Sequence, residues 1–337
     1  MNNNESNPRR VLITGTAGFI GFHLAKLLLA EGFRVQGYDG MTDYYDVTLK
    51  LRRHAMLLQN PNFSAIEGML EDRARFDAMA DDFQPDVIVH LAAQSYVPKA
   101  LASPADTLVN NTVGQINLCE ACLRAGIDPV ILVIGSSEEY GFVEPDDMPV
   151  TESQAFRPGN PYAVSKIAQD MLGYQYFRTH GMRIVRLRPF NHFGPGQTDR
   201  FVLSSFARQI AQIEAGDVEP TVLTGDLSSR RDFLDVRDVA RAYRLALDRA
   251  EPGEVYNIAS GTALPVGDLL ERLISMASVP VEVRPDPARM RPSDVPVIVG
   301  DPTKFRTVTG WEPQIPIDES LRDTLDYWRS EIVAKER

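Results

Sequence analysis

A tyrosine and a lysine stand four positions apart in the segment NPYAVSKIAQD, which spans residues 160–170 and otherwise has the pattern of an amphipathic helix. At this spacing Tyr162 and Lys166 lie one turn apart on one helical face, so both can reach the same bound molecule. An ammonium group beside a phenol lowers the pKa of the phenol from its ordinary value of about 10. The pair therefore indicates a proton donor or acceptor, although the same spacing also occurs where a half-buried tyrosine precedes a solvated lysine.

A glycine-rich turn near the N-terminus indicates a phosphate-binding site. Gly15, Gly18 and Gly21 follow the apolar run RVLIT (10–14) and open the helical pattern FHLAKLLLAEG. Glycines in such a turn let the backbone approach a pyrophosphate and leave this anion at a helix N-terminus. The next predicted strand ends with Asp39, whose carboxylate can accept hydrogen bonds from ribose hydroxyls and would repel a 2′-phosphate. These features predict NAD(H) in preference to NADP(H); the alternative is a glycine turn of another α/β protein with an exposed aspartate.

Alternating strands and helices must position these groups. Further buried strands are predicted at 33–39, 85–93 and 129–137, separated by helical stretches such as TLVNNTVGQINLCEACLRAG. This alternation predicts an α/β fold of the Rossmann type, a doubly wound parallel sheet with helices on both faces. We expect an NAD-binding domain over 8–190 and a smaller, mainly substrate-binding region over 191–330, some of whose segments return to the sheet.

Composition and charge limit the possible partners. The 337 residues include 35 Lys and Arg against 46 Asp and Glu, a formal net charge of -11, so no global basic field is available for nucleic acid or an anionic membrane. The N-terminal MNNNESNPRR lacks an apolar stretch behind its arginines, and no later apolar run approaches the roughly 20 residues that span a bilayer. We therefore expect a cytoplasmic protein that binds neither nucleic acid nor membrane.

The only cysteines, Cys119 and Cys122, form a CxxC pattern inside a predicted helix. This pattern can indicate redox or metal chemistry, but no second cysteine pair is present to complete a zinc site. We interpret them as two small buried helix residues and predict no metal site.

Four segments carry a resemblance to a known family: GTAGFIG, HLAAQ (90–94), GSSEEYG (135–141) and YAVSK. With them the chain resembles, almost from end to end, the extended short-chain dehydrogenases/reductases, and among these the NAD-dependent nucleotide-sugar epimerases and dehydratases. The resemblance implies that Tyr162 is the acid/base at a sugar hydroxyl and that Ser136 shares the substrate oxygen. It also implies that Lys166 lowers the pKa of the tyrosine and binds the nicotinamide ribose.

The resemblance implies further contacts with cofactor and substrate. Asn191 in RPFNHFGPGQ matches a residue that contacts the sugar or its phosphate, and Arg231 in RRDFLDVRD and Arg291 in RMRPSDVP match residues that hold the nucleotide diphosphate. Guanidinium groups suit phosphate oxygens. Asn111 resembles an asparagine that supports the catalytic lysine through water. The residues expected at the cofactor are Gly15, Gly18, Phe19, Ile20, Gly21, Asp39, Leu70, Ala92, Tyr162 and Lys166.

One position departs from the family pattern. Many relatives have an aspartate that binds the adenine amino group where this chain has Met69, in the segment EGMLED. The adenine contact is therefore expected from the backbone or from neighbours such as Leu70.

Two parts of the chain resemble different members of the family. Residues 130–330 most resemble the GDP-4-keto-6-deoxymannose reductases, whereas residues 38–53 resemble the UDP-glucuronate 4-epimerases. Family members commonly dimerise through a four-helix bundle, so we expect a homodimer that uses helices near 105–125 and 161–180.

Glu138 complicates the choice of reaction. It follows Ser136 by two residues, where the related GDP-mannose 4,6-dehydratases have the base that removes the C5 proton of the sugar; a reductase needs no such base. The expected function is NAD(H)-dependent reduction of a 4-keto-6-deoxy nucleotide sugar, with GDP-linked substrates favoured and a product of the GDP-rhamnose type. The alternatives are a GDP-mannose 4,6-dehydratase, a nucleotide-sugar 4-epimerase of the UDP-glucuronate type, and a dinucleotide-sensing regulator that catalyses nothing.

Overall fold

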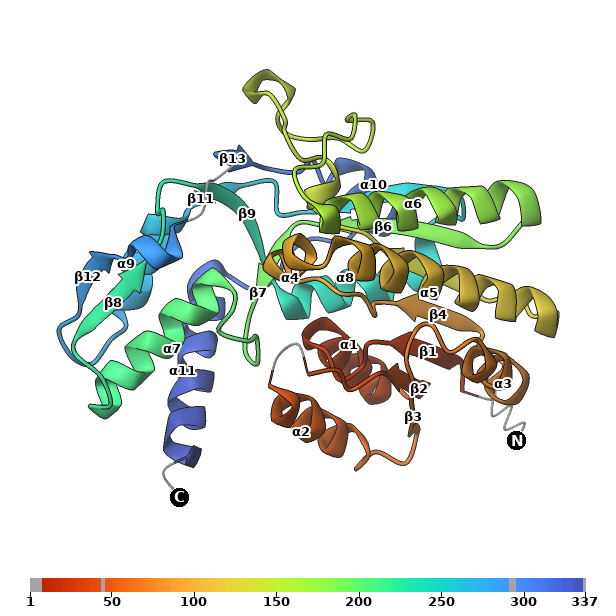
Figure 1. The fold of residues 1–337 in the computed structure, drawn as a ribbon, viewed down its shortest axis with the longest axis horizontal. Coiled ribbons are helices and arrows are strands. Elements are labelled where there is room, and N and C mark those ends of the chain that lie inside the picture. The colour runs from red at the N-terminus through yellow and green to blue at the C-terminus, as the bar shows by residue number, and fades with distance from the viewer. Residues whose placement is uncertain (1–7, 44–45, 291–294, 336–337) are drawn as a thin grey trace. The chain divides into compact units, whose positions relative to one another are not determined.

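The computed structural model describes residues 8–43, 46–290 and 295–335 (Figure 1). The chain forms two compact units. Unit 1 consists of the residues up to Glu139 together with Pro158–Arg188 and Ala240–Tyr256, and unit 2 consists of Tyr140–Arg157, Pro189–Val239 and the residues from Asn257 onward.

A parallel seven-stranded sheet is the centre of unit 1, with strand order β10-β6-β5-β4-β1-β2-β3. The runs VLIT, VIVH and VILVI form its central strands because apolar, β-branched residues suit strands that are buried on both faces. Strand order reverses between β1 and β4, and ligands of such sheets bind at the carboxyl ends of the strands beside this point. The predicted α/β class is confirmed. The strands are β1 (Arg10–Thr14), β2 (Arg34–Asp39), β3 (Phe63–Glu67), β4 (Val87–His90), β5 (Val130–Ile134), β6 (Ile184–Pro189) and β10 (Val255–Ile258), and β6 and β10 end on residues that belong to unit 2.

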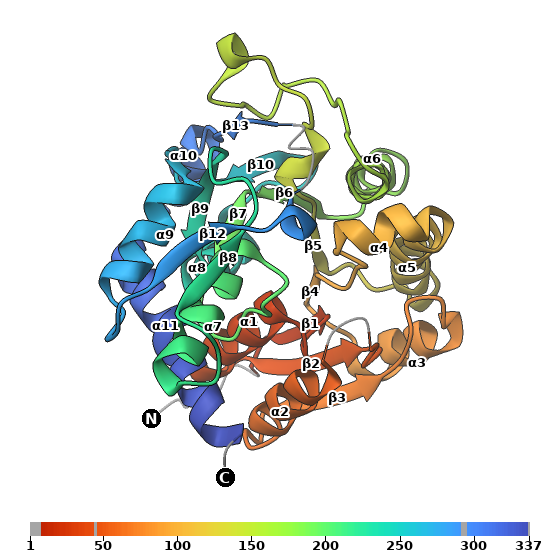
Figure 2. The same ribbon diagram turned by 60° about the vertical axis from the view of Figure 1, so that its left-hand side comes forward.

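Helices α3, α5 and α6 cover one face of this sheet (Figure 2). Their apolar residues pack with those of β1, β4 and β5 in one buried cluster, which includes Cys119 and Cys122 as free thiols. The interpretation of both cysteines as buried helix residues is confirmed. No helix among the described residues combines the length and the apolar character needed to cross a bilayer. The helical elements are α1 (Phe19–Ala30), α2 (Val47–Leu57), α3 (Arg73–Phe83), α4 (Val97–Ala102), α5 (Pro104–Ala125), the 3-10 turn η1 (Ser137–Glu139), α6 (Pro161–His180) and α8 (Val236–Arg249), of which the part from Ala240 belongs to unit 1.

Unit 2 contains two smaller sheets and its own core. In the first sheet β9 pairs with β11, β13 and β7, and in the second β8 pairs with β12. Helices α7, α9 and α11 enclose an apolar cluster that includes Trp328 and Phe206. The strands are β7 (Asn191–Phe193), β8 (Thr221–Thr224), β9 (Arg230–Asp235), β11 (Ala263–Pro265), β12 (Glu282–Pro285) and β13 (Val297–Ile298). The helical elements are η2 (Pro145–Asp147), α7 (Val202–Ala215), α9 (Val266–Ser275), η3 (Pro287–Arg289), α10 (Thr303–Thr309) and α11 (Ile317–Lys335).

Candidate active site

The glycine turn joins β1 to α1. Gly15 has a φ of +80°, in the left-handed region that favours glycine, and its N–H donates to the backbone of β2. A Cβ atom on Gly21 would lie 2.2 Å from the Gly15 carbonyl oxygen, so only glycine lets the turn close this tightly against the helix. Gly18 is the N-cap residue of α1, and Phe19 and Ile20 follow in its first turn. Backbone N–H groups in a first turn have no acceptor within the helix, which makes this cradle fit a pyrophosphate.

Asp39, at the end of β2, binds the glycine turn directly. Its Oδ2 accepts a hydrogen bond from the Ala17 N–H at 3.0 Å, and its Oδ1 accepts from the Met41 N–H at 2.9 Å. Two buried cations of α2 lie beside it: Lys50 Nζ is 3.7 Å from Asp39 Oδ1, and the Arg53 guanidinium donates to the Ala17 carbonyl at 3.0 Å. Burial lowers the pKa of Lys50, whereas the Asp39 carboxylate raises it. Asp39 therefore has a structural role in the turn, and its charge is compensated.

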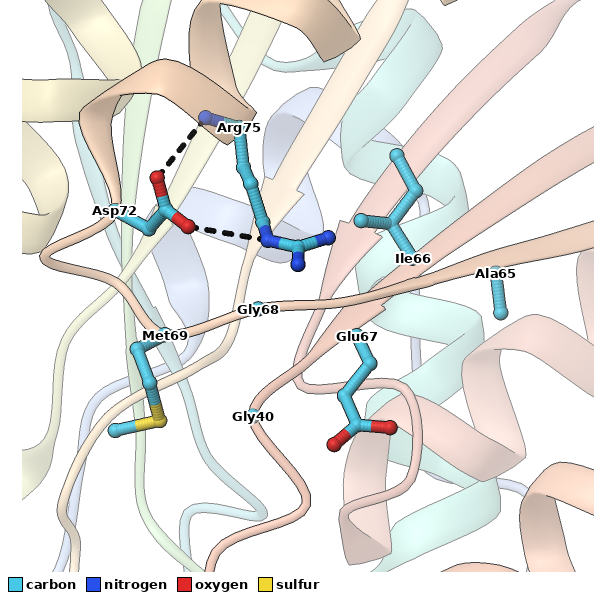
Figure 3. A pocket seen from close by; sticks show the side chains of 8 residues that line it. All are labelled: Gly40, Ala65, Ile66, Glu67, Gly68, Met69, Asp72 and Arg75. Atoms are coloured by element: carbon cyan, nitrogen blue, oxygen red, sulfur yellow. Dashed lines mark hydrogen bonds and ion pairs between the residues drawn. The ribbon is translucent and has the colours of Figure 1, made fainter.

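A pocket of about 590 Å³ lies beside the carboxyl ends of β2 and β3 (Figure 3). Met69 lines this pocket and is 44% exposed, whereas Leu70 is buried. Figure 3 shows Met69 and Glu67 projecting from one side of the segment, with Asp72 and Arg75 joined by hydrogen bonds on the other. The backbone of Ala92 donates to Thr14 Oγ1 at 3.0 Å in the neighbouring turn after β4. The lining residues are Gly40, Ala65, Ile66, Glu67, Gly68, Met69, Asp72 and Arg75.

Ser136, Tyr162 and Lys166 come together at the carboxyl end of β5. Ser136 lies in the turn that follows this strand, and Tyr162 lies in the first turn of α6. The Ser136 hydroxyl is close enough to the phenol of Tyr162 to lower its pKa, and Lys166 Nζ donates to the carbonyl of Ile134 at 2.7 Å. All three side chains are buried, so the structure holds a hydroxyl, a phenol and an ammonium together away from bulk water.

The pKa of Tyr162 is raised, in the direction opposite to the expected one. Burial is the largest cause, the Ser136 hydroxyl opposes it, and the carboxylates of Glu138 and Glu139 raise the pKa further. Burial also lowers the pKa of Lys166 to about 8, against the effect of Glu139. Desolvation of the phenolate is the dominant effect on Tyr162, and the hydrogen bond of Lys166 goes to Ile134, so the lowered pKa that the tyrosine–lysine spacing suggested for the phenol is not found in this structure.

Glu138 stands at the start of the helix that carries the tyrosine. The Glu138 side chain is exposed, and its Oε2 accepts a hydrogen bond from Asn160 Nδ2 at 3.1 Å. Asn160 is the N-cap residue of α6 and accepts from the Ala163 N–H at 2.9 Å. Glu138 is therefore oriented toward the first turn of α6, with its carboxylate accessible to solvent.

Two buried polar residues, His90 and Asn111, lie near Lys166 or contact its helix. His90 lies at the end of β4, and burial, followed by the charge of Lys166, lowers its pKa to about 3, so the imidazole is neutral. Its Nδ1 is 2.9 Å from Thr14 Oγ1. Asn111, on α5, donates a hydrogen bond of 2.8 Å to the hydroxyl of Ser165, the residue before the lysine. The structure thus places Asn111 one residue from Lys166 and in contact with its helix.

The expected substrate-binding residues belong to unit 2. Asn191 is the first residue of β7 and pairs in register with Phe233 of the parallel strand β9. Arg231 lies on the same strand β9, and its guanidinium donates to the carbonyl of Arg230 at 2.9 Å. Asn191 and Arg231 therefore lie on adjacent strands of one sheet, whereas Arg291 lies outside the described residues.

The aspartates of RRDFLDVRD are anchors for the fold of unit 2. Asp235 accepts from the Ser320 hydroxyl at 2.6 Å, and Asp238 accepts at 3.0 Å from the backbone N–H groups of Gln314 and Ile315. Asp232 is completely buried and accepts hydrogen bonds from the backbone and hydroxyl of Ser260 and from the backbones of Gly261 and Gly300. These contacts fix the strand from which Arg231 projects.

Comparison with known proteins agrees with this geometry. The model of a family described as GDP-mannose 4,6 dehydratase matches residues 12–324. The chain belongs to this family. The GDP-6-deoxy-D-mannose reductase of Pseudomonas aeruginosa is 37% identical over 326 residues, which are 96% of this chain and 98% of that protein. The UDP-glucuronate 4-epimerase of Thermodesulfobacterium geofontis is 29% identical over 95% of this chain and 96% of its own length.

A solved structure of a family member shows the same fold. The structure described as RMD from Pseudomonas aeruginosa complexed with NADPH has a TM-score of 0.81 and 35% identity, and the match covers 96% of this chain and 99% of that chain. The resemblance to the extended short-chain dehydrogenases/reductases is therefore confirmed. The family consists of nucleotide-sugar reductases, epimerases and dehydratases, all of them enzymes, and NAD(H) is the family cofactor.

Several buried charged residues escaped the sequence-based prediction, among them Lys50, Arg53 and Glu139. The spacing of Lys50 and Arg53 places them on one helical face, but that face is ordinarily assigned to solvent because charged residues are mostly exposed. Nothing in the pair Glu138–Glu139 indicates which of the two glutamates is buried.

Proposed function

We propose that this chain is an NAD(H)-dependent reductase of a 4-keto-6-deoxy nucleotide sugar, with the GDP-linked ketosugar as its substrate. The observation that carries the proposal is the buried phenol of Tyr162 beside Ser136 and Lys166, in a chain that is 37% identical over 96% of its length to a GDP-6-deoxy-D-mannose reductase. A reductase begins its cycle with a proton donor at C4 of the sugar. A dehydratase or an epimerase begins by removing the proton of the C4 hydroxyl, which requires the phenolate.

The roles of the three side chains follow from their positions. NAD(H), when bound, supplies the hydride for the C4 carbonyl. Tyr162 gives its phenolic proton to the carbonyl oxygen as it becomes a hydroxyl, and Ser136 donates a hydrogen bond to the same oxygen. Lys166 holds a positive charge near the phenolate that remains, and this phenolate then recovers a proton from water. The product is an alcohol, and each turnover oxidises one NADH.

The binding assignments belong to the same proposal. Gly15, Gly18 and Gly21 with the start of α1 bind the pyrophosphate of the cofactor, and the pocket that Met69 lines receives its adenosine end. Asn191 and Arg231 bind the nucleotide diphosphate of the substrate, a role shared with Arg291. The preference for GDP rests on the Pseudomonas aeruginosa reductase, whose name specifies GDP-6-deoxy-D-mannose.

A 4,6-dehydratase is the second candidate, and Glu138 is the observation that favours it. This carboxylate is exposed at the N-terminus of α6, two residues after Ser136, where the family's dehydratases have their C5 base. Its hydrogen bond to Asn160 equally suits a residue that only orders the start of the helix.

Cofactor stoichiometry separates the two candidates. The protein would be incubated with GDP-4-keto-6-deoxymannose and, separately, with GDP-mannose, and NADH absorbance would be followed while NMR identifies the products. We expect one NADH oxidised for each ketosugar reduced, little action on GDP-mannose, and only a modest loss of turnover in Glu138→Gln. Conversion of GDP-mannose without net NADH loss, abolished in Glu138→Gln, would establish the dehydratase instead.

We also propose that the enzyme is a homodimer formed through α5 and α6, which pack against each other. Their outer faces expose apolar side chains at helical spacing, namely Val109 and Val113 on α5 and Val164, Met171 and Tyr174 on α6. Sedimentation velocity should give a dimer for the wild type and a monomer for Met171→Glu. A monomeric wild type would contradict this assignment.

A further inference from the structure

Glu139 has an environment unlike that of the glutamate beside it. Glu138 is exposed, whereas Glu139 is completely buried behind the turn that carries Ser136. Its Oε1 accepts a hydrogen bond from the Ser136 N–H at 2.8 Å, and its own N–H donates to the Ser136 carbonyl at 3.2 Å. The carboxylate and the backbone of one residue therefore hold the backbone of the serine on both sides.

A chain of buried ion pairs connects Glu139 to α6. Arg188 Nε lies 3.1 Å from Glu139 Oε2 and donates to Asp170 Oδ2 at 3.0 Å. Asp170 also accepts from the Arg186 guanidinium at 2.8 Å, and all four side chains are at least nine-tenths buried. Loss of one partner of such a pair destabilises the fold, because it leaves an uncompensated charge in a medium that solvates the charge poorly.

The spacing of residues on α6 connects these ion pairs to Tyr162 and Lys166. Tyr162, Lys166 and Asp170 are separated by four residues each, so they lie along one face of α6. The same helix face thus presents the phenol, the ammonium and the carboxylate that holds Arg188. Arg188 in turn lies at ion-pair distance from Glu139 Oε2, and the other carboxylate oxygen of Glu139 accepts from the Ser136 N–H.

We propose that Glu139 is a positioning residue: with Arg188 and Asp170 it locks the Ser136 turn to the helix that carries Tyr162 and Lys166, so that the serine hydroxyl and the phenol address one substrate oxygen. The inference rests on the proposed roles of Ser136 and Tyr162. It does not depend on which nucleotide sugar is the substrate, because the same two groups serve a reductase, a dehydratase and an epimerase.

Gly135 leaves the space that the Glu139 carboxylate occupies. A Cβ atom there would lie 2.2 Å from Glu139 Oε1, so the carboxylate occupies the space that any other residue would fill. Gly135→Ala should therefore displace the Glu139 carboxylate without removing a charge. This substitution provides a second way to disturb the contact with Ser136.

The negative charge of Glu139 also affects the pKa of Lys166. Burial and then the Asp170 carboxylate raise the pKa of Glu139, whereas the Arg188 guanidinium, the Ser136 N–H and the Lys166 ammonium oppose them and favour the charged form. Glu139 in turn raises the pKa of Lys166, which burial lowers. His90, whose pKa burial and then the charge of Lys166 lower, is neutral, and the phenol of Tyr162 lies one turn away on the same helix as Lys166. Loss of the Glu139 charge should therefore move the alkaline limit of activity, set by deprotonation of Lys166, to lower pH.

A double-mutant cycle tests whether Glu139 acts through the serine hydroxyl. The variants are Glu139→Gln, Ser136→Ala and the two combined, and kcat and KM are measured on whichever sugar the wild type converts. We expect Glu139→Gln to lower kcat by roughly 10- to 100-fold with little change in KM, and by less than about threefold in the Ser136→Ala background. Gly135→Ala should show the same dependence on Ser136.

Controls separate this role from a general loss of stability. Glu214→Gln breaks a partly buried pair with Arg329 in unit 2 and should leave kcat and the pH profile unchanged. Thermal unfolding and NADH fluorescence show whether each variant is folded and binds cofactor. An equal loss of kcat in both serine backgrounds, or an unshifted alkaline limit in a folded Glu139→Gln enzyme, would overturn the proposal. If the wild type converts another nucleotide sugar instead, the proposed function fails and the cycle still tests Glu139.

Discussion

Lys50 Nζ lies 3.7 Å from Asp39 Oδ1, and both side chains are buried, 3% and 8% exposed. Lys50 also donates to Thr42 Oγ1 at 3.0 Å. A carboxylate at the end of the second strand repels the 2′-phosphate of NADPH. A lysine beside the carboxylate weakens this repulsion. The ion pair therefore predicts a preference for NADH over NADPH that is smaller than Asp39 alone would give.

Substitutions of Lys50 and of Asp39 should shift the preference for NADH over NADPH in opposite directions. Lys50→Gln leaves the Asp39 charge uncompensated and should raise the ratio of kcat/KM for NADH to that for NADPH by about tenfold, equivalent to about 1.4 kcal/mol. Asp39→Asn should lower the same ratio. Fluorescence titration with each cofactor measures the effect on binding directly, and equal ratios in wild type and Lys50→Gln would show that the pair does not face the ribose.

Tyr162→Phe should lower turnover by roughly 10² to 10⁴ because it removes the proton donor and keeps the ring. The substitution removes one hydroxyl and leaves the buried ring in place, so it should leave the fold and NADH binding intact. Steady-state kinetics give the turnover, and NADH fluorescence and thermal unfolding provide the controls. Turnover close to that of the wild type would remove Tyr162 from the mechanism.

The sequence was sufficient where local chemistry determines the structure. The turn around Gly15 requires a backbone that only glycine adopts, and the i, i+4 spacing of Tyr162 and Lys166 fixes a shared face once the helix is known. The order of strands and helices likewise follows from apolar runs and turn residues.

The sequence was insufficient where burial determines the chemistry. The pKa of Tyr162 is raised chiefly by desolvation, which has no signal in the YxxxK pattern. The difference between exposed Glu138 and buried Glu139 arises from the turn after β5 and from Arg188, which is distant in sequence. The burial of Asp232 could not be predicted from the sequence either, because its four hydrogen bonds come from segments that only folding brings together.

The glycine turn predicts a large difference between two glycine-to-alanine substitutions. In Gly21→Ala the new Cβ would meet the Gly15 carbonyl oxygen at 2.2 Å, and backbone cannot yield as a side chain can. We expect a loss of about 2–3 kcal/mol in unfolding free energy and weaker NADH binding. Gly267→Ala, in α9, meets only ordinary contacts at 3.5 Å and beyond, so it should be neutral or stabilising by up to about 1 kcal/mol. Denaturant unfolding compares the two, and similar losses would show that the turn can relax.

The Glu214–Arg329 pair predicts how stability depends on pH. Arg329 donates two hydrogen bonds of 2.7 Å to the Glu214 carboxylate, and these lower its pKa to about 2, with burial opposing and the Ser278 N–H assisting. Because the folded pKa lies below the ordinary value of 4.5, the stabilisation is present above pH 4.5 and is lost as the pH falls toward 2. Arg329 is 34% exposed, so solvent screening reduces the expected contribution to about 1–2 kcal/mol. Unfolding of wild type and Glu214→Gln should therefore differ by this amount near pH 7 and converge in acid. A difference that stays constant down to pH 3 would mean that the variant acts through packing and not through the charge of Glu214.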